Sequence, residues 1–178
     1  MSNPSKHLGL LLIDFQDVFL KAIPDRERLL KRSTFALKAA DLLGVSVAVT
    51  EQLPKKLGAT TEVLSSSWDV NTPVFDKNAF SAFEAEGLHR WIESNQIDHL
   101  LLTGIETSIC IYQTALQALG ADIGVTLLAT ASVNAALKTV PPCWNNYFPW
   151  TRISYLARRF FTAYLGAPNI HSFVNLMN

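Results

Sequence analysis

Three residues have side chains that could catalyse a reaction together, and each follows a predicted strand. They are Asp14, Lys77 and Cys110. A thiolate attacks carbonyl carbons, but it needs a neighbour that accepts its proton and donors that hold the developing oxyanion. Asp14 could accept the proton, and a nearby Lys77 would lower the pKa of the thiol by attraction between opposite charges. Because the carboxyl ends of parallel strands line one crevice, the three side chains could meet there.

Cys110 is the last residue of the stretch 103–110, which follows an apolar run and forms a predicted turn. A predicted helix begins there, and Gly120 is expected to end it. At a helix N-terminus, backbone N–H groups and the positive end of the dipole favour the thiolate. The alternative is a structural role, because a free cysteine is often buried as a small hydrophobic residue. The helix is predicted from apolar residues at helical spacing, namely Ile111, Ala115, Leu116 and Leu119.

The composition suits a single compact domain over residues 1–178, because 49% of the 178 residues are hydrophobic. Fifteen basic and fifteen acidic residues cancel, so no global field attracts nucleic acid or an anionic membrane. Only two cysteines occur, and no secretory signal pattern is visible, which favours a reducing cytoplasm. No apolar run reaches the ~20 residues of a membrane span. A small molecule is therefore the expected partner.

Strands and helices alternate along the chain. Five segments are predicted to be strands, namely 8–13, 45–50, 73–75, 97–102 and 121–128. Helical periodicity predicts one helix from Pro24 to Gly44 and another over 84–94. This alternation indicates an α/β fold with a doubly wound, mostly parallel sheet. Residues 51–72 are predicted to be a long functional loop or lid.

Three motifs occur together in an order and spacing that is typical of one enzyme family. They are Leu11–Gln16 (LLIDFQ), Asp76–Phe83 (DKNAFSAF) and Gly104–Cys110 (GIETSIC), the last followed by Thr114-Ala115-Leu116. Through them, residues 8–128 resemble the isochorismatase-like cysteine hydrolases. Thr50–Gly58 (TEQLPKKLG) further resembles the branch of isochorismatase-domain-containing proteins. The resemblance implies a three-layer α/β/α fold, usually within a homo-oligomer.

The same resemblance assigns roles to individual residues. It implies a catalytic triad of Asp14, Lys77 and Cys110 that needs no cofactor. In the family a non-proline cis peptide bond precedes the nucleophile turn, and here it would join Ile105 to Glu106. The backbone N–H groups of Glu106 and Cys110 would then form the oxyanion hole.

Four further side chains become candidates for substrate binding through the resemblance. Gln16 and Gln52 are candidate substrate contacts. Trp68 and Phe80 are candidate walls of the pocket, and a role of both aromatic rings in the core is equally open.

Two departures from the family pattern restrict what can be transferred. Family nicotinamidases bind a metal through an Asp-x-His arrangement, which residues 51–53 (EQL) do not offer, so we expect no metal. Ser108 stands where many members carry histidine, so the substrate preference does not transfer. Members that cleave the vinyl ether of isochorismate can do without the cysteine, so Cys110 favours hydrolysis of an amide or related C–N bond.

The family pattern stops near Leu128, and residues 129–165 are atypical. No acidic residue occurs after Asp122, whereas arginines and aromatic residues cluster. One interpretation is a basic, aromatic tail that packs on a partner or a membrane surface. The other is a pair of compensating frame changes near Ala129 and Leu165, since a shifted frame permits an acidic, family-like segment. Cys143 falls in this stretch and is interpreted as structural or incidental.

These observations lead to one main hypothesis and three alternatives. The main hypothesis is a cofactor-free cysteine hydrolase that acts on a small amide or ureido substrate. The first alternative is a non-catalytic binding or scaffold protein on the same fold. A dinucleotide-binding protein is disfavoured because residues 11–18 lack a glycine-rich turn. A redox protein would need Cys143 as a resolving cysteine close to Cys110.

Overall fold

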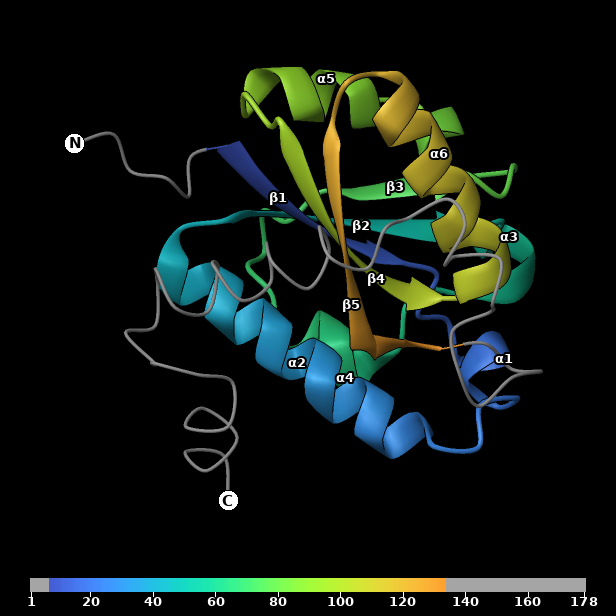
Figure 1. The fold of residues 1–178 in the computed structure, drawn as a ribbon. Helices are drawn as coiled ribbons and strands as arrows, with labels where there is room; N and C mark the ends of the chain where they lie inside the picture. Colours follow the sequence, from blue (N-terminus) through green and yellow to red (C-terminus); the bar gives the residue numbers. More distant parts are fainter. Residues whose placement is uncertain (1–6, 134–178) are drawn as a thin grey trace. The chain divides into compact units, whose positions relative to one another are not determined.

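The apolar runs of the sequence form a five-stranded sheet in the computed structural model, which describes residues 7–133 and the side chains of residues 7–128. All neighbouring strands are parallel, and their order is β3-β2-β1-β4-β5 (Figure 1). The strands are β1 (Leu8–Ile13), β2 (Ser46–Gln52), β3 (Val74–Lys77), β4 (His99–Ile105) and β5 (Gly124–Val133). The central strand β1 is buried on both faces, which explains its unbroken apolar sequence.

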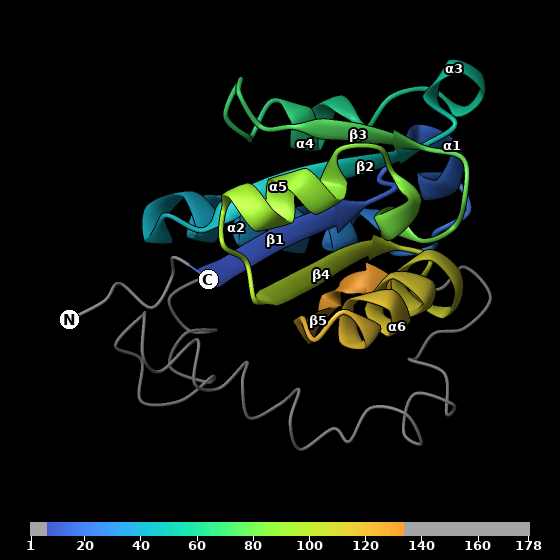
Figure 2. The same cartoon turned by 90° about the horizontal axis from the view of Figure 1, so that it is seen from above.

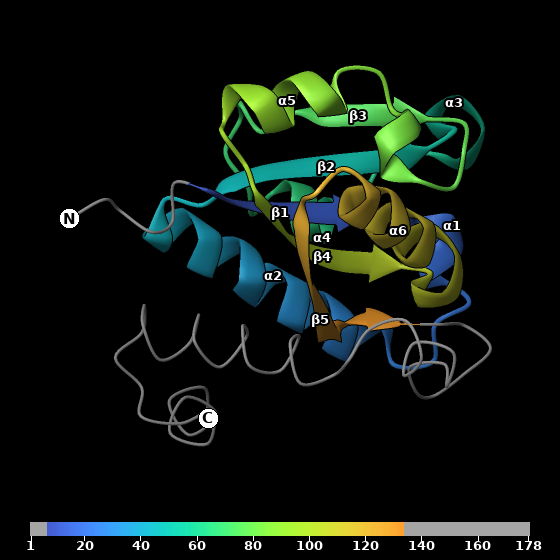
Figure 3. The same cartoon turned by 45° about the horizontal axis from the view of Figure 1, so that its top comes forward.

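Helices cover both faces of this sheet, as the sequence predicted. Figures 1 and 3 show α5 (Leu88–Ser94) and α6 (Tyr112–Gly120) on one face, and α2 (Arg26–Leu43) with α4 (Glu62–Ser65) on the other. The short elements are α1 (Asp17–Leu20), α3 (Pro54–Leu57), the 3-10 helix η2 (Ala82–Glu84) and the π-helical turn η3 (Thr107–Ile111). The architecture is therefore the expected three-layer α/β/α arrangement.

The direction of the strand connections reverses between β1 and β4, and this reversal places a crevice at their carboxyl ends. Figure 2 shows α1 and α3 beyond the carboxyl ends of β1 and β2. At this edge Ile13 of β1 pairs with Gly104 of β4. Gly104 has φ +141°, and a Cβ there would overlap the carbonyl oxygen of Ile13. Glycine at this position therefore permits the close approach of β1 and β4 beside the crevice.

Strand β3 forms one edge of the sheet and pairs only with β2. Three of its four residues are exposed or half-buried, and only Lys77 is buried. The strand therefore contributes little apolar surface to the core.

The sequence placed the strands correctly but ended four of them too early, including β5, which continues past 128 to Val133. Strand β2 continues past residue 50 to Gln52, β3 continues past 75 to Lys77, and β4 continues past 102 to Ile105. Polar residues at these ends interrupt the apolar runs on which the prediction rested. The backbone pairing continues regardless, because each segment remains hydrogen-bonded to a neighbouring strand.

Two helix predictions were wrong in detail. The helix expected over 84–94 begins only at Leu88, because the 3-10 turn η2 and Gly87, with φ +91°, precede it. Helix α6 ends at Gly120 as expected, although Gly120 is its last helical residue and not the residue after the helix. Of the apolar residues whose spacing predicted this helix, Ala115 is buried, whereas Leu116 and Leu119 are 41% and 43% exposed.

The segment expected to be a lid, residues 51–72, is tethered rather than free. It contains the end of β2 and the short helices α3 and α4. The backbone N–H of Thr60 donates to Glu51 Oε1 at 2.7 Å, and that of Thr61 donates to the carbonyl of Phe15 at 2.8 Å. These bonds fasten the segment to β2 and to the residues after β1.

The last expected strand, 121–128, corresponds to β5, which continues to Val133. Most of the atypical stretch 129–165, including Cys143, lies outside the described residues. Of the two places where frame changes were expected, Leu165 lies outside them too, whereas Ala129 belongs to β5. The single-domain assignment therefore remains a prediction. Within residues 7–133, no helix combines the length and apolar character that crossing a membrane requires.

Candidate active site

Asp14, Lys77 and Cys110 meet at the carboxyl edge of the sheet. Lys77 Nζ lies 2.7 Å from Asp14 Oδ2 and 3.8 Å from Cys110 Sγ. Asp14 and Cys110 therefore both lie against the Lys77 ammonium. The three residues are 1%, 3% and 8% exposed respectively, so the cluster is nearly closed to solvent. An acid, a cation and a thiol in contact provide the groups needed for nucleophilic attack on a carbonyl carbon.

The backbone after β1 turns the Asp14 side chain into this cluster. Asp14 has φ +58°, a left-handed conformation that aspartate tolerates better than most residues. Its N–H donates to the carbonyl of Thr50 at 3.0 Å, which fixes the turn against β2. The Thr50 hydroxyl donates to Asp14 Oδ1 at 3.4 Å. Both carboxylate oxygens therefore have hydrogen-bond donors.

Backbone hydrogen bonds to Glu106 close the turn that carries Cys110. The peptide bond between Ile105 and Glu106 is cis, as the family resemblance implied. The carbonyl of Glu106 accepts from the N–H groups of Ile109 and Ile111, at 3.1 and 3.2 Å. Cys110 is the fourth residue of the π-helical turn η3, which continues into α6. Its placement near a helix start is therefore as predicted.

The expected activation of the thiol by its surroundings is wrong for the resting site. Burial raises the pKa of the Cys110 thiol to about 12, and the negative charge of Asp14 acts in the same direction. The charge of Lys77 and the backbone N–H of Glu106 lower the pKa, but they do not outweigh burial. Burial also raises the pKa of Asp14, and Lys77 offsets part of this effect. The site therefore holds a protonated thiol beside a carboxylate of increased basicity.

We expect alkylation of Cys110 by iodoacetamide to become faster throughout pH 7–10, by about tenfold per pH unit, because only the thiolate reacts. The rate should not level off in this range, since the thiol pKa is raised to about 12. Peptide-map mass spectrometry would measure the rate, with N-acetylcysteine as the control thiol. A plateau below pH 8 would contradict the raised pKa.

The other predicted site residues differ in how far they are buried. Gln16 and Gln52 are both buried, and Gln52 Oε1 accepts from Lys77 Nζ at 2.6 Å. Phe80 is 53% exposed and follows Ala79, whose carbonyl accepts from Lys77 Nζ at 3.2 Å. Trp68 is half-buried after α4. The structure therefore brings Gln52 into contact with the triad.

Thr114 is a positioning residue that the sequence analysis missed. It is fully buried, its hydroxyl donates to the carbonyl of Cys110 at 2.7 Å, and it accepts from the N–H of Ala82 at 2.9 Å. It therefore links the nucleophile turn to the segment that follows Lys77. The signal was present, since a threonine four residues after another helical residue commonly bonds back to its carbonyl.

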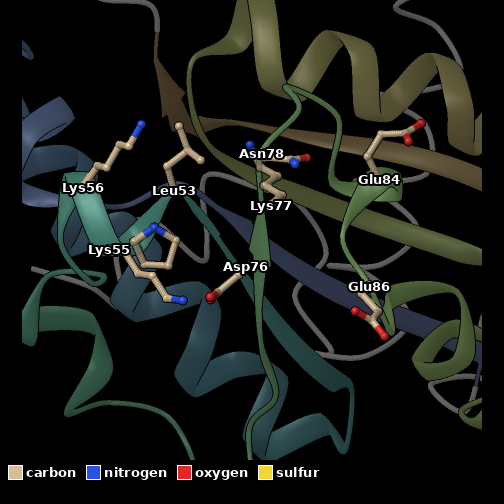
Figure 4. Close-up of a pocket in the computed structure, with 9 residues that line it drawn as sticks. Leu53, Lys55, Lys56, Asp76, Lys77, Asn78, Glu84 and Glu86 are labelled. Atoms are coloured by element: carbon tan, nitrogen blue, oxygen red, sulfur yellow. The ribbon is translucent and has the colours of Figure 1, made fainter.

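A pocket of about 500 Å³ lies beside the triad, at the end of β3 (Figure 4). Lys55 and Lys56 of α3 line one side of it, and Glu84 and Glu86 line the other. Neither Asp14 nor Cys110 lines this pocket. Among the described residues, no group of three or more histidine, cysteine or acidic side chains is placed to hold a metal ion.

The fold and the motifs agree with comparisons to known proteins. The profile of the Isochorismatase domain matches residues 9–139. Isochorismatase family protein 1A of Dictyostelium discoideum is 32% identical over 140 residues, which cover 75% of this chain and 68% of that protein.

Two solved structures are similar in fold. The MAR1 ribonuclease of Caenorhabditis elegans has a TM-score of 0.71 at 23% identity, over 97% of this chain and 88% of that one. The N-carbamoylsarcosine amidase of Thermoplasma acidophilum has a TM-score of 0.67 at 18% identity, over 82% and 91%. At these identities the likeness concerns the fold alone. Three findings agree: the profile matches most of the chain, the three motifs are present, and a parallel sheet carries them. This chain belongs to the isochorismatase family.

Proposed function

We propose that the protein is a cysteine hydrolase that cleaves the C–N bond of a small amide or ureido substrate without a cofactor. The observation that carries the proposal is the buried contact of Asp14, Lys77 and Cys110 at the carboxyl edge of the sheet. Membership of the family supports a hydrolase. The fold shared with an amidase supports the choice of a C–N bond.

In the first half of the reaction, Asp14 takes the proton of Cys110 as Sγ forms a bond to the substrate carbonyl carbon. The raised pKa of Asp14 suits this role, because a more basic carboxylate is a better proton acceptor. The backbone N–H groups of Glu106 and Cys110 would hold the oxyanion of the tetrahedral intermediate. Lys77 remains a cation and offsets the negative charge as it moves from Asp14 to the substrate.

In the second half, the C–N bond breaks and Asp14 returns its proton to the leaving nitrogen. The products are ammonia or an amine and a thioester on Cys110. Asp14 then takes a proton from water, which attacks the thioester carbonyl. The acid product leaves, and Asp14 returns the proton from water to Sγ. The net reaction therefore consumes one water per C–N bond cleaved.

A panel of small primary amides, N-carbamoyl amino acids and ureido acids would test this function through release of ammonia. Quenched samples of the active substrate should show a protein mass increased by the acyl group minus one hydrogen, on the peptide of Cys110. Alkylation of Cys110 without turnover of any panel member would favour the binding or scaffold protein instead. A homo-oligomer, a cytoplasmic location and the absence of a nucleic-acid partner remain predictions that this panel does not address.

A further inference from the structure

The ammonium group of Lys77 is surrounded by oxygen atoms from three different segments. Asp14 Oδ2 lies at 2.7 Å, Gln52 Oε1 at 2.6 Å and the carbonyl of Ala79 at 3.2 Å. An ammonium has three hydrogens, so these three oxygens can engage all of them. Cys110 Sγ, at 3.8 Å, is farther than each oxygen. Lys77 therefore acts on the thiol mainly through its charge, and the oxygens decide where that charge sits.

The backbone of Gln52 is held by hydrogen bonds to Gln16 and by its pairing with β3. It is the last residue of β2 and lies opposite Lys77 in the pairing of β2 with β3. Its N–H donates to Gln16 Oε1 at 2.8 Å, and its carbonyl accepts from Gln16 Nε2 at 3.0 Å. Gln16 Nε2 also donates to the carbonyl of Gly58. These three hydrogen bonds of the Gln16 amide are all to backbone groups, and they hold the end of β2, where Gln52 lies.

The neutral amide of Gln52 suits this place better than a carboxylate would. Asp14 already raises the pKa of Cys110 through its negative charge. A second carboxylate against Lys77 would add to this effect and oppose formation of the thiolate. An amide oxygen accepts a hydrogen bond from the ammonium and adds no charge.

We propose that Gln52 is a positioning residue, which holds the Lys77 ammonium between Asp14 and Cys110, rather than a substrate contact. The proposal rests on the proposed function, because it concerns the same site. Loss of the amide oxygen leaves one ammonium hydrogen without an acceptor in a buried place, so the ammonium should no longer be held in one position between Asp14 and Cys110. Catalysis should then suffer in the chemical step rather than in substrate binding.

The variant Gln52→Met removes the acceptor and keeps the length of the side chain. We expect kcat to fall by at least tenfold while KM changes by less than twofold. Alkylation of Cys110 at a fixed pH of 8 should slow by a similar factor. Gln52→Asn, which keeps the amide but withdraws its oxygen from Lys77, should show the same pattern if Gln52→Met does not fold. Gln113→Met makes the same change at an exposed position of α6 and is the matched control.

The alkylation assay requires no substrate, so it tests this proposal even if the wild-type protein hydrolyses nothing in the panel. Absence of wild-type turnover would refute the proposed function alone. A higher KM with unchanged kcat and unchanged alkylation would show that Gln52 binds substrate, and would overturn the proposal. Unchanged values in both Gln52 variants would overturn it as well.

Discussion

Replacement of Cys110 by alanine is expected to lower kcat/KM by a factor on the order of 10⁴ or more, because the nucleophile of a triad cannot be replaced by water at the same site. Cys110→Ser should be nearly as inactive, since a hydroxyl loses its proton far less readily than a thiol. Ammonia release from the best substrate of the panel would measure both effects. The acyl adduct on the peptide of Cys110 should disappear in both variants.

The matched control is Cys143→Ala, which removes the second cysteine and should keep wild-type activity. Thermal unfolding should show that Cys110→Ala remains folded, because Thr114 bonds to the backbone of Cys110 and not to its thiol. A folded Cys110→Ala protein that keeps more than a tenth of the activity would exclude Cys110 as the nucleophile.

Removal of the buried cation should have the largest effect on stability. Lys77→Met leaves the Asp14 carboxylate buried without its partner, which costs about 3–5 kcal/mol of unfolding free energy at pH 7. Urea titration followed by circular dichroism would measure this loss. Lys38→Met removes an exposed lysine of α2 and should change stability by no more than about 0.5 kcal/mol.

The loss of unfolding free energy caused by Lys77→Met should increase as the pH rises. Burial raises the pKa of Asp14 above 3.8, and Lys77→Met removes the charge that offsets this rise. The folded variant then binds the Asp14 proton more tightly than the unfolded chain does. Its stability must therefore fall as the pH rises from 3.8 through the raised pKa of the folded state. The difference from wild type should be smaller at pH 4.5 than at pH 7.

The double variant Asp14→Asn/Lys77→Met removes both charges and should be more stable at pH 7 than Lys77→Met alone. Its stability should also vary less with pH in this range, because the buried carboxyl group is gone. Equal losses for the single and double variants would show that the ion pair contributes nothing beyond packing.

The parts of the site that a sequence can predict are those encoded by local pattern. Apolar runs located the strands, and the acid, the lysine and the thiol were recognised at their carboxyl ends. The direction of the Cys110 pKa could not be predicted, because it depends on burial by segments distant in sequence. The local sequence shows the helix N-terminus, which favours the thiolate, but not the burial that opposes it. The fold shows that desolvation is the larger effect.

The same limit applies to side chains whose partners are distant in sequence. Gln16 stays a candidate substrate contact, and nothing in the sequence indicates that its amide bonds to the backbone of Gln52 and Gly58. Leu116 and Leu119 match helical spacing, but spacing alone does not show which side of a helix meets the sheet. Strand ends were missed because polar residues there serve the site instead of the core.

The exposed edge strand β3 has one buried residue, Lys77, and the same residue forms the ion pair of the candidate active site. One side chain therefore serves both the candidate active site and the buried part of β3. A descendant that lost hydrolysis could discard Cys110 at little structural cost. Loss of Lys77 would cost more, because it would leave the Asp14 carboxylate buried without its partner. Retention of this lysine in a relative would consequently be weak evidence of catalysis, whereas retention of the cysteine would be strong evidence.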